Sequence, residues 1–167
     1  MNTKNIRYIV FDVDGTLTDG KLYIGADGES FKAFHVKDGY AIHDILPKFK
    51  ITPIIMTGRE SKIVEKRCKE LDIKEYYQGV LNKRQKLMEL VEQWGIKSDL
   101  QGVYEQIAYV GDDINDLSCM KICGFTACPK DAVEEIKDYV DYVSKKNGGE
   151  GAVREIVEKI VGVKNGK

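Results

Sequence analysis

Two aspartates separated by one residue follow a short apolar run near the start of the chain. Asp12 and Asp14 come directly after Tyr8–Phe11, within the segment DVDGTLTDG. Residues two positions apart in an extended chain point to the same side, so the two carboxylates would repel each other. A divalent cation relieves that repulsion, and hard oxygen ligands suit Mg²⁺. The pair therefore predicts a magnesium site, although an Asp-Gly sequence can also simply close a turn.

A second acidic group follows the apolar run AYV. In GDDINDL, which spans 111–117, the acids are Asp112, Asp113 and Asp116. One of them can complete a Mg²⁺ site, and another can orient the ligands through water. The alternative is that Asp112 or Asp113 caps the N-terminus of a helix, where acids are favoured. Capping accounts for one of these acids but hardly for all three.

Two further segments carry groups that can bind phosphate, although the first of them, MTGRES, can also be an ordinary turn. In MTGRES, Thr57 and Gly58 can offer a hydroxyl and a backbone N–H to a phosphate oxygen. Arg59 can add a charged fork to an anionic group. Lys83 opens a predicted helix, where the helix dipole mildly disfavours a lysine, and neutralising a phosphate is one task for it. The alternative for Lys83 is a solvated surface lysine.

The elements that must position these residues alternate between strands and amphipathic helices, which predicts βαβ units and a mostly parallel sheet. Ligands of such sheets bind beyond the carboxyl ends of the strands, where these polar clusters fall. An Asp-Gly turn between two short runs also predicts a small hairpin after the first strand. The expected strands are Tyr8–Phe11, Thr52–Met56 and Ile107–Val110, with a short strand-like run at 75–79. One expected helix begins near Asp38, and the others span 61–71, 84–94, 116–122 and 152–161. The two runs of the hairpin are Lys21–Ile24 and Ser30–His35.

Composition narrows the class of protein. The 167 residues suit a single domain, and 43% hydrophobic with 32% charged residues is an ordinary globular composition. The formal net charge of −1 offers no general field for nucleic acid or an anionic membrane. No apolar run is long enough for a membrane span or a secretory signal, so we expect a cytoplasmic protein. The four cysteines form no CxxC pair and are expected to be reduced core thiols rather than a metal site.

The order of the motifs resembles a known family. DxDGT, a Thr-Gly turn, a lysine and GDDxxD occur in the order found in the haloacid dehalogenase-like phosphatases. The runs DGTLTDG, FKAFHVKDGYAI, MTGRES, YYQG, GDDINDL and KKNGGEGAVREIVE look like the 3-deoxy-octulosonate 8-phosphate phosphatase group and its nonulosonate phosphatase relatives. The resemblance implies a three-layer, Rossmann-like α/β fold and hydrolysis of a sugar acid phosphate.

The resemblance also implies roles for the motif residues. Asp12 would be the nucleophile that becomes an aspartyl-phosphate, and Asp14 the general acid and then the general base. Asp12, the backbone carbonyl of Asp14 and Asp112 would hold Mg²⁺. Asp113 and Asp116 would be supporting acids. The phosphoryl oxygens would be bound by Thr57, Gly58 and Lys83.

The substrate side rests on arginines. At the position after Thr57-Gly58, the octulosonate 8-phosphate enzymes carry an arginine, which Arg59 resembles, whereas a nonulosonate-selective relative carries an acid. The forked guanidinium of Arg59 suits the C1 carboxylate of a sugar acid. Arg67 could assist, and Arg154 ends a glycine-rich segment (147–154) that helps close the site in the resembling family; a solvated helix face and a flexible turn are the alternatives. The 9-phosphate of a nonulosonate is the alternative substrate.

The spacing of the motifs leaves no room for a cap domain. Only residues 15–56 separate Asp14 from Thr57, and only 58–82 separate Thr57 from Lys83. We expect one domain over 1–167, with a hairpin flap at about 21–35 and a C-terminal helix with a frayed tail at about 152–167. The resembling family forms tetramers, which implies that neighbouring subunits close each site.

Two other functional classes compete with a phosphatase. A phosphoacceptor signalling domain also uses acids, Mg²⁺, Thr and Lys on a parallel sheet. It would need an aspartate at the position of Thr57, however, and it has no counterpart of GDDINDL. A non-catalytic assembly module of a sugar-acid pathway is the other alternative, and the complete set of catalytic side chains disfavours it.

Overall fold

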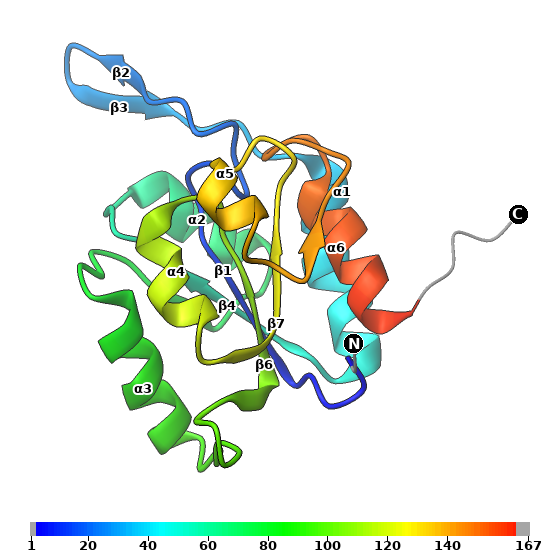
Figure 1. Ribbon diagram of the computed structural model, residues 1–167. Coiled ribbons are helices and arrows are strands. Elements are labelled where there is room, and N and C mark those ends of the chain that lie inside the picture. The colour runs from blue at the N-terminus through cyan, green and yellow to red at the C-terminus, as the bar shows by residue number, and fades with distance from the viewer. Residues whose placement is uncertain (1–2, 163–167) are drawn as a thin grey trace, which may run out of the picture.

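A six-stranded, fully parallel sheet forms the centre of the molecule (Figure 1), and the computed structural model describes residues 3–162. The strand order is β5-β4-β1-β6-β7-β8. The predicted α/β fold with a mostly parallel sheet is therefore confirmed. The strands are β1 (Tyr8–Phe11), β4 (Thr52–Met56), β5 (Glu75–Tyr77), β6 (Tyr104–Val110), β7 (Cys123–Cys128) and β8 (Tyr142–Val143).

Helices cover both faces of the sheet, which gives three layers. The apolar core on one face includes Ile9 and Phe11 of β1 with residues of α2, α6 and the segment 41–46 that follows α1, and the core on the other face includes Val10 with residues of α3, α4 and α5. This alternation follows from the two-residue period of a strand. The helices are α1 (Val36–Tyr40), α2 (Lys62–Glu70), α3 (Lys83–Gln93), α4 (Ile114–Met120), α5 (Glu134–Lys137) and α6 (Ala152–Val161).

The chain reverses its direction across the sheet beside β1. It runs from β1 to β4 and β5 on one side, and then crosses to β6, β7 and β8 on the other. Ligands of open α/β sheets bind at such a switch point, outside the carboxyl ends of the strands. Asp12, Thr57 and Asp112 all follow strands at this edge, so the topology brings the three predicted clusters together.

The hairpin predicted after the first strand is present. Its strands β2 (Tyr23–Gly25) and β3 (Gly28–Phe31) pair antiparallel and are shorter than expected. In Figure 1 the hairpin projects away from the body of the molecule. Its apolar residues Ile24 and Phe31 are 67% and 52% exposed.

Several elements differ from the sequence-based expectation. β7, β8 and α5 were not predicted, because they are short or rich in small residues such as those of CGFTAC, whose apolar signal is weak. β6 begins three residues before the predicted start. The helix near Asp38 is irregular: α1 continues as a π-helical segment over Ala41–Ile45 and a 3₁₀ turn over Leu46–Phe49. Pro47 lies in that last turn, where the missing N–H of proline breaks the regular hydrogen-bond pattern.

The remaining expectations concern thiols, the membrane and the tail. Cys68, Cys119, Cys123 and Cys128 are all buried and free, as expected for core thiols. Within the described part of the chain, no helix is long and apolar enough to cross a membrane. The tail that we expected to be frayed, 163–167, lies outside the described residues.

Candidate active site

Asp12 and Lys83 form a buried ion pair at the switch point. The Asp12 backbone N–H donates to the Val110 carbonyl at 2.9 Å, which fixes the residue between β1 and β6. Lys83 is the first residue of α3 and is 4% exposed, and its Nζ donates to Asp12 Oδ1 at 2.7 Å. Burial acts to lower the pKa of Lys83, but the carboxylates of Asp12 and Asp116 raise it above its usual value. The charged ammonium group of Lys83 is therefore stabilised by carboxylates rather than by solvent.

Asp116 orients that lysine. The residue is fully buried, and its Oδ1 accepts hydrogen bonds from Lys83 Nζ at 2.7 Å and from the Tyr109 hydroxyl at 2.8 Å. Its Oδ2 accepts the backbone N–H of Asp112 at 3.2 Å. With both oxygens engaged, Asp116 is suited to holding Lys83 in place.

Asp113 caps a helix. Its exposed side chain accepts the backbone N–H of Ile114 at 2.7 Å and forms a capping box with Asp116 at the start of α4. α4 accordingly begins at Ile114, two residues before the predicted start. Asp113 therefore takes the place that the capping alternative predicted. The role of supporting acid, which the resemblance implies for Asp113, remains a prediction.

Asp112 lies against the loop that follows β1. Its Oδ1 accepts the Thr16 hydroxyl at 3.1 Å. Gly15 has φ +92°, and a Cβ placed on it would lie 2.0 Å from Asp112 Oδ2. Only glycine permits this approach, because any side chain would displace the carboxylate.

Three acids, of which Asp12 and Asp116 are buried and Asp112 is half-buried, make a site that suits a hard cation. Ligand oxygens of Asp12, Asp112 and Asp116 all lie within 4.8 Å of one another. Burial, with the nearby charge of Asp116, raises the pKa of Asp12 to about 6, although Lys83 opposes the shift. Burial, with the charges of Asp12 and Asp116, raises the pKa of Asp112 to about 7. Three carboxylates lie around one ammonium group here, and a donor set of carboxylate oxygens is the kind that Mg²⁺ binds.

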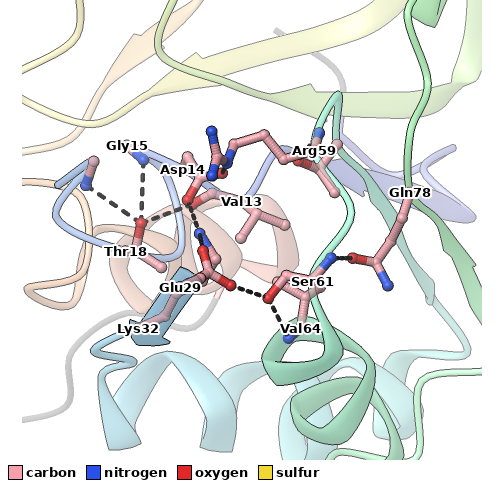
Figure 2. A network of polar contacts seen from close by, with 12 residues as sticks. Val13, Asp14, Gly15, Thr18, Glu29, Lys32, Arg59, Ser61, Val64 and Gln78 are labelled. Atoms are coloured by element: carbon pink, nitrogen blue, oxygen red, sulfur yellow. Dashed lines mark hydrogen bonds and ion pairs between the residues drawn. The ribbon is translucent and has the colours of Figure 1, made fainter. Parts of the chain in front are cut away.

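The carboxylate of Asp14 is not part of this acid group and contacts two cations instead. Lys32 Nζ donates to Asp14 Oδ1, and Arg59 Nε lies 3.8 Å from Asp14 Oδ2 (Figure 2). Lys32 also contacts Glu29, and the Glu29 carboxylate accepts a hydrogen bond from the Ser61 hydroxyl. Both cations come from segments far from Asp14 in sequence, so only the fold brings them together.

Thr57 and Gly58 extend β4 beside Asp12. Ile55 is in register with Phe11, so the residues after β4 lie next to those after β1. The buried Thr57 donates its backbone N–H to the Tyr77 carbonyl at 3.0 Å, and its hydroxyl accepts the Arg59 N–H at 3.4 Å. Gly58 is exposed.

Arg67 and Arg154 each lie over an aromatic ring in or just before α1 rather than in the acid cluster. Arg67 pairs with Glu70 at 2.9 Å and lies over the Phe34 ring. Arg154 pairs with Glu158 at 2.6 Å and lies over the ring of Tyr40. Within one chain the structure therefore does not join these arginines to Asp12, and their predicted contact with substrate stays a prediction.

The glycine-rich segment lies on the loop of its own chain. A Cβ on Gly148 would lie 1.9 Å from the Gly15 carbonyl oxygen, and the Gly149 N–H donates to the Thr16 carbonyl at 3.3 Å. Asp38 then caps α6 by accepting the backbone N–H groups of Gly151 and Arg154. Glycine is required at 148 because two backbones meet there.

Sequence reasoning missed Lys32, Glu29, Ser61 and Thr16 as parts of the site. In the run FKAF, Phe31 is 52% exposed whereas Lys32 is 9% exposed. This is the reverse of the usual preference, in which lysine is almost never fully buried unless it is paired. No local signal reveals such an inversion, because it depends on carboxylates supplied by other segments.

Comparison with known proteins gives a consistent result. Residues 75–156 match a family model described as haloacid dehalogenase-like hydrolase. The chain is 41% identical over 158 residues to the 3-deoxy-D-manno-octulosonate 8-phosphate phosphatase of Escherichia coli strain K12, which covers 95% of this chain and 80% of that protein. It is 39% identical over 158 residues to the same-named protein of Haemophilus influenzae, covering 95% and 84%.

Solved structures resemble this one over almost its whole length. The cobalt-bound deoxy-D-mannose-octulosonate 8-phosphate phosphatase of Haemophilus influenzae superimposes with a TM-score of 0.87 at 38% identity, covering 96% of this chain and 90% of that one. The 3-deoxy-D-manno-octulosonate 8-phosphate phosphatase of Moraxella catarrhalis, in complex with magnesium, phosphate and KDO, superimposes with a TM-score of 0.88 at 36% identity, covering 98% and 90%.

Proposed function

This chain belongs to the haloacid dehalogenase-like hydrolase family and is a phosphatase without a cap domain, and we propose that its substrate is 3-deoxy-D-manno-octulosonate 8-phosphate. One observation carries the choice of a sugar acid: Arg59 lies beside Asp14 with 47% of its side chain exposed. A half-exposed guanidinium next to the reacting groups is free to meet the carboxylate of a 2-keto sugar acid. The relatives named for this substrate support the same assignment.

The proposed reaction uses Asp12 and Asp14 in two steps. Asp12 attacks phosphorus and forms an aspartyl-phosphate, while the sugar–oxygen bond to phosphorus breaks and Asp14 gives its proton to the leaving oxygen. A water molecule then attacks phosphorus and gives its proton to Asp14, which releases phosphate and restores Asp12. Lys83 with the groups of Thr57 and Gly58 would bind the phosphoryl oxygens.

Mg²⁺ is the proposed cofactor, held by Asp12, Asp112 and the backbone carbonyl of Asp14. When bound, the ion supplies positive charge that offsets the repulsion between a carboxylate nucleophile and a phosphate. Asp116 is left for Lys83, with which it forms a buried ion pair at 2.7 Å. A relative crystallised with magnesium and phosphate supports the choice of metal.

Stabilisation by Mg²⁺ is expected to grow with pH. In the metal-free protein the pKa of Asp12 is raised from 3.8 to about 6 and that of Asp112 from 3.8 to about 7. A carboxyl whose folded-state pKa is raised destabilises the fold as pH rises from its unfolded value through its folded value, and the penalty is complete above the folded pKa. The metal-free protein should therefore lose stability between about pH 4 and pH 7, where the carboxylates lose their protons.

The measurement is a thermal melt with and without Mg²⁺. At about 100 times its Kd, a ligand adds about 2.7 kcal/mol, or roughly 5–10 °C for a domain of this size. That gain is expected near pH 8, and a clearly smaller one near pH 5, where protons compete with the cation. An equal gain at both pH values would contradict the assignment of Asp12 and Asp112 as ligands.

A kinetic panel tests the substrate. Phosphate release with Mg²⁺ is measured for 3-deoxy-D-manno-octulosonate 8-phosphate and for nonulosonate 9-phosphates, and we expect kcat/KM to be about tenfold or more higher for the 8-phosphate. A preference for the 9-phosphates would replace the proposed substrate with the nonulosonate alternative. No turnover of any sugar acid phosphate would remove the substrate class altogether.

Arg59→Ala should weaken recognition of the carboxylate. The loss of a charge-assisted contact of about 1.5–3 kcal/mol predicts a rise in KM of roughly 10- to 150-fold for the sugar acid phosphate. A phosphate ester without a carboxylate, such as glycerol phosphate, should show little change in KM. Parallel losses on both esters would mean that Arg59 acts on Asp14 or on the fold instead.

Assembly is the last part of the proposal. We expect the chain to act in the cytoplasm as one domain over 1–167 and as a homotetramer whose subunits close each other's sites. The projecting hairpin supports this, because Leu22, Ile24 and Phe31 present apolar side chains to solvent, and clustered exposed apolar residues mark interaction surfaces. The molar mass from light scattering measures the oligomeric state.

A further inference from the structure

Lys32 is a buried lysine that the proposed reaction does not use. It follows β3 directly, and only 2% of its side chain is exposed. Its ammonium donates to the carboxylate of Asp14 and lies 2.9 Å from Glu29 Oε1. Burying an ammonium group costs several kcal/mol unless it is paired. Lys32 is therefore held between the hairpin and Asp14 by two carboxylates.

The same contacts continue to a rigid part of the fold. Glu29 Oε2 accepts a hydrogen bond from the hydroxyl of Ser61, which is the N-cap of α2 (Figure 2). The Ser61 hydroxyl accepts the Ile63 N–H at 3.2 Å, and the Ser61 backbone N–H donates to Gln78 Oε1 at 2.8 Å. A continuous chain of polar contacts thus runs from the start of α2 through the hairpin to Asp14.

Asp14 needs such an anchor. It is half-buried and sits on the turn after β1, where the following Gly15 takes φ +92°. A group that donates and accepts a proton must be held within hydrogen-bond reach of the reacting oxygen, because small displacements cost large factors in rate. The two cations beside it differ in exposure: Arg59 is 47% exposed and faces solvent, whereas Lys32 is enclosed.

We propose that Lys32 is a positioning residue for Asp14, and that Glu29 and Ser61 fix Lys32 by tying the base of the hairpin to α2. The inference rests on the proposed function, because it deepens the role of Asp14 in proton transfer. In this proposal the hairpin helps to position Asp14 in the active site of its own subunit. Arg59 remains the cation for substrate, and Lys32 acts only through Asp14.

The test compares two leaving groups. p-Nitrophenolate departs readily without a proton, whereas the alkoxide of 3-deoxy-D-manno-octulosonate needs one from Asp14. Because kcat/KM covers the steps up to cleavage of the phosphorus–oxygen bond, Lys32→Met should lower kcat/KM for the sugar 8-phosphate by about tenfold or more beyond its effect on p-nitrophenyl phosphate. Lys32→Arg, which keeps the charge, should recover most of that selective loss. Equal losses on both esters would overturn the proposal in favour of a purely structural lysine.

A double-mutant cycle provides an independent readout. In an Asp14→Asn background, adding Lys32→Met should change kcat/KM by no more than about twofold, because residues that act through one another are not additive. Additive losses would overturn the proposal. If Lys32→Met does not fold, as judged by its thermal melt, Lys32→Gln replaces it in the comparison of leaving groups and in the double-mutant cycle. Glutamine keeps the capacity for hydrogen bonds but removes the charge.

The wild-type protein separates this inference from the proposed function. Wild type without phosphatase activity on either ester would overturn the proposed function and this inference with it. Wild type that hydrolyses p-nitrophenyl phosphate but not the sugar 8-phosphate would remove the proposed substrate alone. The Lys32 comparison then uses an alkyl phosphate that wild type hydrolyses, and the same two results decide it.

Discussion

Asp12→Asn is expected to lower phosphatase activity by at least about a thousandfold while leaving the protein folded. The substitution keeps the size of the side chain but removes the nucleophilic carboxylate. Burial raises the pKa of Asp12 to about 6, with the charge of Asp116 adding to the shift, so near pH 7 the surroundings disfavour the ionised side chain. A neutral asparagine should therefore melt at the same temperature as wild type or slightly higher in the absence of metal.

The matched control for this prediction is Asp113→Asn. It changes an aspartate of the GDDINDL motif in the same way, but Asp113 is exposed and its side chain caps α4. Asparagine is an equally good N-cap, so most of the activity and stability should remain. Comparable turnover by Asp12→Asn and wild type would remove Asp12 as the nucleophile. A loss in Asp113→Asn as deep as that in Asp12→Asn would show that Asp113 does more than cap the helix.

Lys83→Met is expected to damage both stability and activity. Lys83 Nζ lies 2.7 Å from carboxylate oxygens of both Asp12 and Asp116, and all three residues are buried. Removing one partner of a buried ion pair leaves uncompensated charge and costs about 3–5 kcal/mol, which a urea titration without metal should detect. Activity should fall by about a hundredfold or more, because the cation that offsets phosphate charge is lost.

A second substitution separates the two effects of Lys83. Asp116→Asn added to Lys83→Met removes one of the carboxylates left unpaired, so the free energy of unfolding should recover in part. Activity should not recover, because no ammonium group returns to the site. Recovery of both would mean that Lys83 serves only the fold, and an unchanged free energy of unfolding in Lys83→Met would contradict the buried ion pair.

Some parts of the fold follow directly from local sequence. The apolar run Tyr8–Phe11 forms β1 within its predicted bounds, and α2 lies within the expected helix 61–71, with the Ser61 hydroxyl as its N-cap. These elements depend on neighbours in sequence, whose periodicity and capping chemistry are visible without the fold. β7, by contrast, consists of small residues and cysteines, and it becomes a strand because β6 and β8 pair with it.

By itself, the sequence determined which strand ends carry acids and that no cap domain fits between the motifs. Asp12, Asp112 and Thr57 could be placed at one edge because the carboxyl ends of parallel strands meet there. Only the tertiary structure decided which charges pair. Lys83 lies between Asp12 and Asp116, and Lys32, which is buried although the preceding Phe31 is exposed, pairs with Asp14. The physical reason is the distance along the sequence over which the residues interact. Secondary structure is set largely by nearby residues, whereas the pairing and burial of a charge depend on groups that come together only when distant segments fold.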